Sequence, residues 1–410
     1  MRDRRPPIAP AVQTEATCCI AGGGPAGMML GLLLARAGVD VVVLEKHADF
    51  LRDFRGDTIH PSTLEIVHQL GLLDEFLALP HQEIRELTGI VGGERLQIAD
   101  FSHLPVRCPF IALMPQWDFL DFLARHARRH PSFALHMSTG VGDLLYQDGR
   151  VAGVRATAPD GPLEIRADLI VGADGRDSTV RAAARLPVKT LGAPMDVLWF
   201  RLPKRAGVTS GVLGRIEAGR IFVMLDRGDY WQCGFVIAKG TLEDIRARGL
   251  EAFRADVARL VGAPVESGVL RDWNEVKLLT VRVDHLTTWF RPGLLCIGDA
   301  AHAMSPVGGV GINLAIQDAV AAANVLAAPL RARGVGLDDL ARVQRRRAWP
   351  TRVTQGIQVF VQNRVVRRVL ESGRPVRPAL AVRLLGRYPR LRRLPGRLVG
   401  LGVRPERLRV

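Results

Sequence analysis

The 410-residue sequence has no run of eighteen or more uninterrupted apolar residues, although 48% of its residues are hydrophobic. We therefore expect a globular protein without a membrane-spanning helix. No apolar run of signal-peptide length precedes Ala16, so export is not expected either. These absences predict a cytoplasmic protein.

Cysteine is also scarce, and the five cysteines lack the spacing of metal ligands. They are Cys18, Cys19, Cys108, Cys233 and Cys296. An odd number of thiols, mostly within apolar runs, predicts buried cysteines in a reducing compartment. The sequence therefore predicts neither a disulfide framework nor a metal site.

Positive charge is concentrated at one end of the chain. Of the net charge of +15, the last fifty residues contribute fourteen arginines against two glutamates, so the rest is nearly neutral. No basic stripe interleaved with stacking aromatics is present, so nucleic-acid binding is not expected. Two interpretations of the basic tail stay open: its helices pack on the rest of the protein, or they contact an anionic membrane surface peripherally.

The stretch from Ala16 to Glu45 predicts a strand, a glycine turn, a helix and a second strand. An apolar run leads into Gly22-Gly23-Gly24-Pro25-Ala26-Gly27, and a second one, Val39 to Leu44, ends at Glu45. Such a unit binds the pyrophosphate of a dinucleotide at the positive end of its helix. The acid at the end of the second strand is placed to accept hydrogen bonds from a ribose.

Each of the three glycines of this motif has its own physical role. Gly22 permits the tight turn, Gly24 lets backbone N–H groups approach a pyrophosphate, and Gly27 lets the helix pack closely on its strand. The flanking strands, the helix and the acid supply the context that a glycine pattern alone lacks. We therefore predict a dinucleotide-binding site.

Two further segments pair an apolar run with an aspartate beside glycine. Residues 169–178 read Leu-Ile-Val-Gly-Ala-Asp-Gly-Arg-Asp-Ser, and residues 291–302 contain Gly298-Asp299; residues 304–313 follow with a glycine-rich loop. Strands that end in this way meet at the carboxyl edge of a parallel sheet, where α/β proteins bind their ligands. We expect the three motifs to form one site.

In this order the motifs resemble those of the class A, single-component FAD-dependent monooxygenases of the para-hydroxybenzoate hydroxylase type. The resemblance implies an α/β protein with a Rossmann-like, glutathione reductase-type FAD domain, an inserted antiparallel β-sheet substrate domain and a C-terminal helical segment. The expected boundaries are 1–84, 108–188 and 280–345 for the FAD domain, 85–107 and 189–279 for the substrate domain, and 346–410 for the basic segment.

The resemblance also implies a set of residues that bind FAD non-covalently. They are Gly22, Gly24, Pro25, Ala26, Gly27, Glu45, Lys46, Arg55, Gln116, Asp174, Gly298, Asp299, Pro306, Gly311, Ile312 and Asn313. Asp174 with Gly175 is further linked to the reduced nicotinamide. A helix that begins near Gly311 would place its positive end beside the anionic edge of reduced flavin.

The implied activity is insertion of one atom of O2 into an aromatic, polyketide-like or other electron-rich small molecule through a flavin C4a-hydroperoxide. NADH or NADPH would supply the electrons at the same FAD, because a second nucleotide motif is absent. A prenyl or quinone-type hydroxylase or reductase of the same superfamily remains the alternative. The intact Asp174-Gly175 and Gly298-Asp299 pairs argue against a non-enzymatic prenyl-binding escort protein. The sequence indicates neither the substrate nor the oligomeric state.

Catalytic side chains are harder to predict. Pro306 is expected beside the flavin ring by resemblance, while His60 either faces the active site or caps a helix. Tyr230 either donates a hydrogen bond to the substrate or packs in the core of its strand. Apolar wall residues are expected among Trp199, Phe222, Met224 and Trp231, all of which also fit a core.

Overall fold

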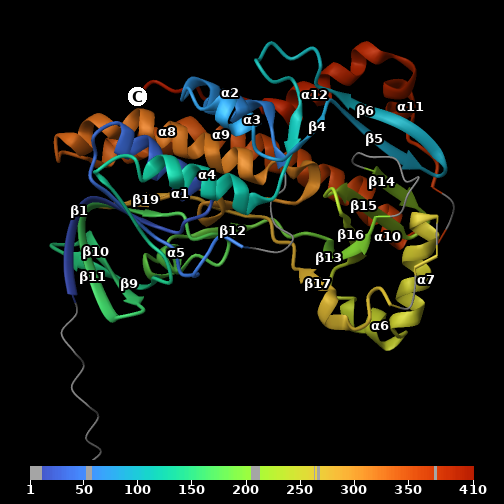
Figure 1. The fold of residues 1–410 in the computed structure, drawn as a ribbon, viewed down its shortest axis with the longest axis horizontal. Coiled ribbons are helices and arrows are strands. Elements are labelled where there is room, and N and C mark those ends of the chain that lie inside the picture. The colour runs from blue at the N-terminus through green and yellow to red at the C-terminus, as the bar shows by residue number, and fades with distance from the viewer. Residues whose placement is uncertain (1–11, 52–57, 205–212, 263, 266–267, 374–375) are drawn as a thin grey trace, which may run out of the picture.

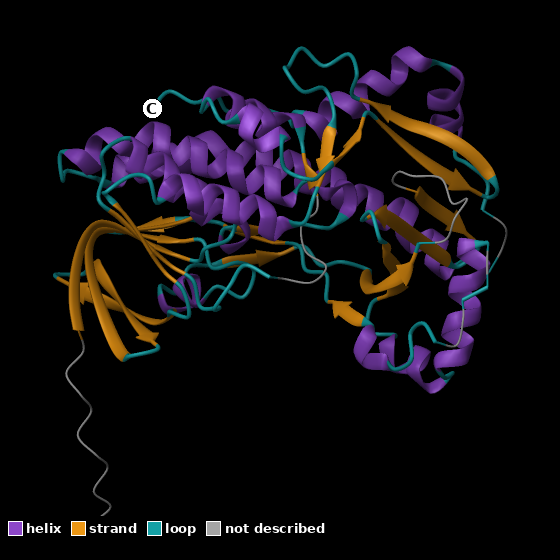
Figure 2. Ribbon diagram, viewed as in Figure 1, coloured by secondary structure: helices purple, strands orange, loops and turns teal. Residues whose placement is uncertain are grey.

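The computed structural model describes residues 12–51, 58–204, 213–262, 264–265, 268–373 and 376–410. Two large sheets lie at opposite ends of the molecule, and a layer of long helices covers the first sheet and reaches toward the second (Figures 1 and 2). The predicted fold class is confirmed: an α/β FAD-binding fold carries a second, mainly antiparallel sheet.

The first sheet has eight strands, five of which form its parallel core. Its main path runs β19 (Phe290–Arg291), β20 (Leu294–Cys296), β11 (Gly161–Gly172), β1 (Val12–Ala21), β2 (Val41–Leu44) and β8 (Phe133–His136), with β9 (Gly140–Gln147) and β10 (Arg150–Ala158) paired antiparallel beside β11. The apolar runs of β1, β2 and β20 are buried because helices or further chain cover both faces. Asp148 and Gly149, both at positive φ, make a tight turn between β9 and β10, as an Asp-Gly pair between apolar runs predicts.

Four helices form the layer over this sheet: α1 (Pro25–Arg36), α4 (Gln116–Ala127), α8 (Gly311–Arg331) and α9 (Leu337–Val361) (Figure 1). Pro25 occupies the first turn of α1, where its missing N–H costs nothing. The segment Val307–Arg331 is long and apolar enough to cross a membrane, but 72% of its apolar window is buried inside the protein. It is a helix of the protein core, packed between α1 and α9.

The second sheet has seven strands, antiparallel except where β14 meets β5. Its order is β17 (Lys277–Leu279), β13 (Met195–Pro203), β16 (Tyr230–Ala238), β15 (Arg220–Asp226), β14 (Leu213–Glu217), β5 (Glu86–Val91) and β6 (Glu94–Asp100). Leu198 and Phe200 point to a cluster that packs against two helices, α6 (Leu242–Ala247) and α7 (Leu250–Val261). The alternate residues therefore face the other way, toward the first sheet.

The apolar and polar pattern of residues 242–261 predicts one helix, and this prediction is wrong in one respect. The chain forms α6 and α7 with a break at Gly249, whose φ is +86°. Only glycine adopts this backbone conformation without strain, so the residue that breaks the helix is visible in the sequence.

Smaller elements complete the fold. Two three-stranded sheets run β3 (Thr58–Ile59), β7 (Ile111–Leu113), β4 (Gln82–Ile84) and β12 (Val188–Thr190), β18 (Asp284–Leu286), β21 (His302–Ala303). The short helices are α2 (Pro61–Gln69), α3 (Leu73–Leu77), α5 (Thr179–Ala183), α10 (Arg367–Glu371), α11 (Leu380–Arg387) and α12 (Arg393–Gly400). Single turns of 3₁₀ helix occur at Trp273–Glu275, Gly298–Ala300, Val307–Gly309 and Pro389–Arg392, and Gln362–Val366 is a π-helical turn. Helix α9 runs unbroken across the expected boundary at residue 345.

Candidate active site

A cavity of about 890 Å³ lies between the carboxyl ends of the parallel strands and the second sheet. This volume is at the upper end of the range of roughly 300–1,000 Å³ typical of ligand and cofactor sites. Its lining includes the glycine turn, Asp174, Asp299 and the start of α8, so the three sequence motifs do meet in space. The opposite wall is the second sheet.

The glycine turn shows two different reasons for having no side chain. A Cβ on Gly22 would lie 2.4 Å from the carbonyl oxygen of Ala173, and one on Gly27 would lie 1.9 Å from the carbonyl oxygen of Gly22. Both glycines are therefore required by the packing of the protein itself. A Cβ on Gly24 would meet nothing within 4 Å and would point into open space. Gly24 is the N-cap of α1, where the positive helix end favours an anion.

Glu45 holds the glycine turn against the end of β2. Its Oε2 accepts the backbone N–H of Gly23 at 2.9 Å, and its Oε1 accepts that of His47 at 3.0 Å. The residue is buried but still lines the cavity. A carboxylate at the end of this strand is the usual acceptor for ribose hydroxyls in dinucleotide-binding folds.

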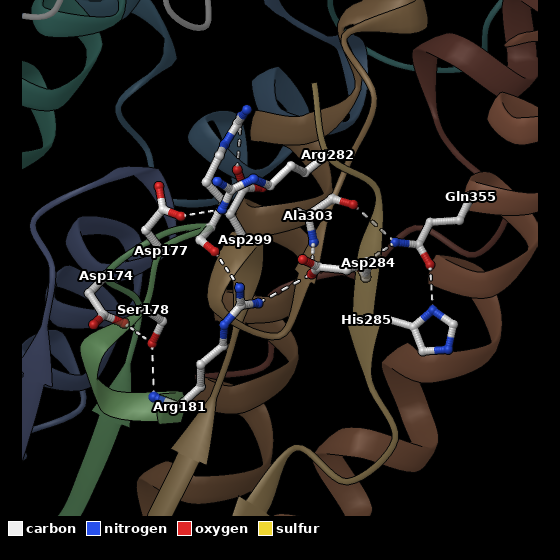
Figure 3. Close-up of polar contacts among 11 residues, drawn as sticks. Asp174, Asp177, Ser178, Arg181, Arg282, Asp284, His285, Asp299, Ala303 and Gln355 are labelled. Atoms are coloured by element: carbon white, nitrogen blue, oxygen red, sulfur yellow. Dashed lines mark hydrogen bonds and ion pairs between the residues drawn. The ribbon is translucent and has the colours of Figure 1, made fainter. Parts of the chain in front are cut away.

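Asp174 organises the loop of the second motif. Its Oδ1 accepts the hydroxyl of Ser178 at 2.5 Å, and its Oδ2 accepts the N–H of Val180 at 3.1 Å, as Figure 3 shows for the serine. Burial raises the pKa of Asp174 above its ordinary value, although these hydrogen bonds oppose the shift. The side chain therefore shapes the loop that faces the cavity.

One ion pair joins the second motif to the third, and two more tie Asp177 and helix α5 to residues 282–284, as Figure 3 shows for the latter two. They link Arg176 to Asp299 at 3.4 Å, Asp177 to Arg282 at 2.5 Å, and Arg181 to Asp284 at 3.2 Å. The last of these pairs is largely buried, and it reaches β18 from helix α5. The two motifs are thus braced across the mouth of the sheet by side chains as well as by backbone pairing.

The start of α8 contributes Pro306, Gly311 and Ile312 to the cavity lining, and Lys46, Gln116, Pro25 and Ala26 line it as well. Asn313 does not line it: its Oδ1 accepts the N–H of His60 at 2.9 Å and the hydroxyl of Thr63 at 2.7 Å. Gly27 and Gly298 lie behind the lining and act through close packing. Arg55 falls outside the described residues.

The structure does not place His60 or Tyr230 at the cavity. His60 is fully buried as the N-cap of α2, and its Nδ1 lies 2.8 Å from the carbonyl oxygen of Val399. Tyr230 is the first residue of β16, where the guanidinium of Arg201 stacks over its ring at 4.8 Å. Neither side chain lines the cavity, so of the three catalytic candidates only Pro306 is in position.

His60 predicts a pH dependence of stability. Burial lowers its pKa to about 4, and the bond to Val399 opposes the shift only partly. An unfolded histidine titrates near 6.5, so the unfolded chain binds the extra proton between pH 6.5 and 4 and stability falls as the pH is lowered through this window. Because of His60, we expect the free energy of unfolding to be about 2 kcal/mol lower at pH 5 than at pH 7.

His60→Asn keeps an N–H donor for Val399 but does not titrate, so it should lack this part of the pH dependence. Urea unfolding of both proteins at the two pH values measures the difference. If the free energies of unfolding of the two proteins differed by the same amount at both pH values, His60 would not be buried in its neutral form.

A buried ion network lies directly behind the third motif. Asp318 on α8 accepts the N–H of Gly298 at 3.1 Å, contacts Nε2 of His302 at 2.5 Å, and receives Nε of Arg347 at 2.9 Å. Glu406 in turn makes a bidentate pair with Arg346 and lies 3.8 Å from Arg347. This network was not predicted from the sequence, because its members lie far apart along the chain and no motif marks them.

The second sheet contributes only apolar side chains and glycine to the cavity, as far as the structure describes the chain. The residues of this wall are Leu87, Met195, Val197, Trp199, Ile221, Val223, Leu225, Gly234, Val236 and Leu279. Of the wall residues expected from the sequence, Trp199 is present, whereas Phe222, Met224 and Trp231 belong to the cluster on the opposite face. The pleat of the sheet decides this division.

Comparisons with known proteins agree with this geometry. A family model described as FAD binding domain matches residues 15–356. The chain is 34% identical over 394 residues to 6-methylpretetramide 4-monooxygenase of Streptomyces rimosus, covering 94% of this chain and 92% of that protein. It is also 28% identical over 323 residues to dialkyldecalin synthase of Streptomyces rugosporus, covering 74% of this chain and 63% of that protein.

The fold is similar to that of p-nitrophenol 4-monooxygenase from Pseudomonas putida. The two structures agree with a TM-score of 0.79 at 22% identity, over 96% of this chain and 99% of the other. This likeness concerns the fold alone. The family match and the sequence relatives define the class: the FAD-dependent aromatic monooxygenases.

The chain belongs to the FAD-binding domain family, in its para-hydroxybenzoate hydroxylase-like group. It is an FAD-dependent monooxygenase that acts on a small molecule with O2, and NAD(P)H is its co-substrate, as is typical of the family.

Proposed function

We propose that the cavity holds FAD along the first sheet and a neutral, largely apolar ring system against the second sheet. The single observation that carries the proposal is the division of the lining into two chemically different walls. The first wall offers backbone N–H groups, carboxylates and two helix N-termini, which suit a phosphorylated, hydroxyl-rich cofactor. The second wall offers apolar contact.

The residues present fit FAD. Gly24 leaves open space at the N-terminus of α1 for a pyrophosphate, and the carboxylate of Glu45, which lines the cavity at the end of β2, suits a ribose. Asp299, on the 3₁₀ turn after β20, faces the cavity next to Arg176 and suits further ligand hydroxyls. Pro306, Gly311 and Ile312 would border the flavin ring. When bound, FAD accepts electrons from NAD(P)H and activates O2 for oxygen transfer.

The protein's own part in the reaction is to position the substrate and exclude water. The apolar second wall excludes water from the reacting ring, which protects reactive species from hydrolysis and decay. The N-terminus of α8 provides a positive end that favours negative charge at the cavity edge. Among the residues that the structure describes, the wall formed by the second sheet offers no carboxylate, histidine or tyrosine to remove a substrate proton. The substrate must therefore be electron-rich through its own substituents.

This wall favours a fused-ring aromatic substrate over a small charged phenol. An ionised carboxylate on the substrate would face apolar side chains without a partner, which is costly. The relative from Streptomyces rimosus acts, by its name, on a pretetramide, and we propose a substrate of similar polycyclic, polyketide-like character for this chain.

The test is a screen of NAD(P)H oxidation with neutral polycyclic phenols and, as the matched set, single-ring phenols that carry a carboxylate. We expect stimulation by the polycyclic compounds and, under ¹⁸O₂, one labelled oxygen atom in the product. Labelled water should leave the product unlabelled. Stimulation only by the carboxylated single rings would contradict the proposed substrate class.

The same experiment distinguishes the proposed oxygen transfer from a second candidate function. Dialkyldecalin synthase, a relative by sequence, is named for making a ring system rather than for adding oxygen. A product formed without NAD(P)H consumption and without label would place this chain with such an enzyme.

A further inference from the structure

The last two helices expose apolar and basic side chains side by side. Helices α11 and α12, joined by the 3₁₀ turn Pro389–Arg392, lie at one corner of the molecule and both contact β6 (Figure 1). The exposed leucines of this segment are Leu380, Leu384, Leu391 and Leu394, and the first and last of these are 72% and 76% exposed. We call these four leucines, together with Arg387, Arg390 and Arg397, the tail surface.

The segment from α11 to α12 is held on the side that faces β6. A Cβ on Gly396 would lie 2.0 Å from the carbonyl oxygen of Asp100, so α12 packs directly on the end of β6. Arg392 donates from Nε to the carbonyl of Leu385 at 2.7 Å and from Nη2 to that of Gly386 at 2.5 Å. These contacts tie the 3₁₀ turn before α12 to the end of α11. The exposed leucines therefore lie on a segment that is attached to β6 and whose turn is held by hydrogen bonds.

The end of the chain packs back on the protein, as one of the two sequence interpretations predicts. Leu401 is buried in a cluster with Ile84, Ile111 and Leu113, and Glu406 pairs with Arg346. The outer face of α11 and α12 is different. Arg387, Arg390 and Arg397 are exposed, and none of them makes an ion pair with a carboxylate among the residues that the structure describes.

We propose that the tail surface docks on an anionic membrane surface. Leucines interleaved with arginines on one face suit the boundary between headgroups and acyl chains, where apolar burial and attraction to anionic lipid act together. A second copy of the chain is a poorer occupant, because a symmetric contact would bring the same arginines against one another. Arg383 on α11 and Arg393 on α12 are exposed as well and add to the positive charge of this segment.

The position of the tail surface gives the docking a consequence for the site. Ile84, Ile111 and Leu113 line the cavity on one side and belong to the cluster of Leu401 on the other. Membrane docking would hold this wall of the cavity beside the lipid, where an apolar substrate concentrates. Docking through the tail surface does not depend on which substrate the cavity holds.

The experiment measures co-sedimentation of the FAD-loaded protein with vesicles of phosphatidylglycerol and phosphatidylcholine in equal parts, and with vesicles of phosphatidylcholine alone. At an ionic strength of about 0.15 M, where charges are screened beyond roughly 8 Å, we expect binding to the anionic vesicles only. The double variant Leu380→Asp, Leu394→Asp should lower the partition coefficient at least tenfold. Arg387→Glu with Arg390→Glu should lower it as well.

The matched control is Leu337→Asp, because Leu337 is an exposed leucine at the first residue of α9, outside the tail surface. It should bind like the native protein, and retained flavin absorbance shows that each variant is folded. Removing residues 376–410 is unsuitable as a test, since it also removes Leu401 and Glu406 from the core.

Three results would overturn the proposal. They are equal binding to neutral vesicles, equal binding by the leucine variant, and no binding at about 0.15 M salt. A dimer or a complex with an acidic protein that the leucine variant abolishes, without vesicle binding, would assign the tail surface to a protein partner instead.

Discussion

Gly24→Val is expected to abolish tight FAD binding while leaving the apoprotein folded. A Cβ at this position meets no protein atom within 4 Å, and the backbone φ of −73° suits any L-residue. The side chain would instead occupy the space that we assign to the pyrophosphate. We expect at least a hundredfold rise in the Kd of FAD, equivalent to about 2.7 kcal/mol. Fluorescence titration of the apoprotein with FAD measures it.

Two controls make this result specific. Gly356→Val adds the same side chain at another glycine with open space, on the exposed side of α9 and outside the cavity lining, and should leave FAD affinity unchanged. Gly27→Val should prevent folding, because its Cβ would overlap the carbonyl oxygen of Gly22 at 1.9 Å. If Gly24→Val bound FAD as tightly as the Gly356 variant, the assignment of the pyrophosphate to this turn would be wrong.

Asp318→Asn is expected to destabilise the protein strongly, although it replaces a carboxylate by an amide of almost the same size. Burial raises the pKa of Asp318, but the charges and hydrogen bonds of His302 and Arg347 outweigh it and hold the pKa below its ordinary value. The carboxylate is therefore ionised at neutral pH, and its contribution to stability is lost only when the pH falls through that lowered pKa. Without it, Arg347, which is 2% exposed, keeps its charge, and the carboxylate of Glu406, 3.8 Å away, is already paired with Arg346.

Breaking a buried pair in this way typically costs about 3–5 kcal/mol. Urea unfolding of the apoproteins, followed by circular dichroism, measures the loss of free energy of unfolding. The control Glu243→Gln removes an exposed pair with Arg246 and should cost less than about 1 kcal/mol. Asp318→Leu combined with Arg347→Met should recover much of the loss, because it removes both charges. A loss for Asp318→Asn no larger than that of the control would contradict the network's role.

The site was predictable where its residues follow one another along the chain. The glycine turn with Glu45 identifies a unit of strand, helix and strand, because local steric constraints determine where glycine is required. Asp174 and Asp299 were found for a similar reason, since each ends an apolar strand. Their expected contacts with FAD remain predictions. Their contacts with Ser178, Val180 and Arg176 are facts of the structure.

The site was not predictable where a side chain's direction depends on distant partners. Nothing near His60 in the sequence shows that Val399 will cover it, and the two are 339 residues apart. Trp199 and Phe222 look equivalent in their alternating strands, yet one lines the cavity and the other packs against α7. Strand pairing register decides which face each occupies, and register depends on the whole sheet.

The sequence by itself determined the family, the cofactor class and the order of the elements that surround the cofactor. Short segments are enough to determine these features, because turn geometry and apolar periodicity are properties of a few consecutive residues. Only the tertiary structure decided which side chains face the cavity, how Asp318, Arg347 and Glu406 brace the third motif, and which face of the basic tail stays exposed. These are contacts between segments far apart in the chain, and they exist only once the chain has packed.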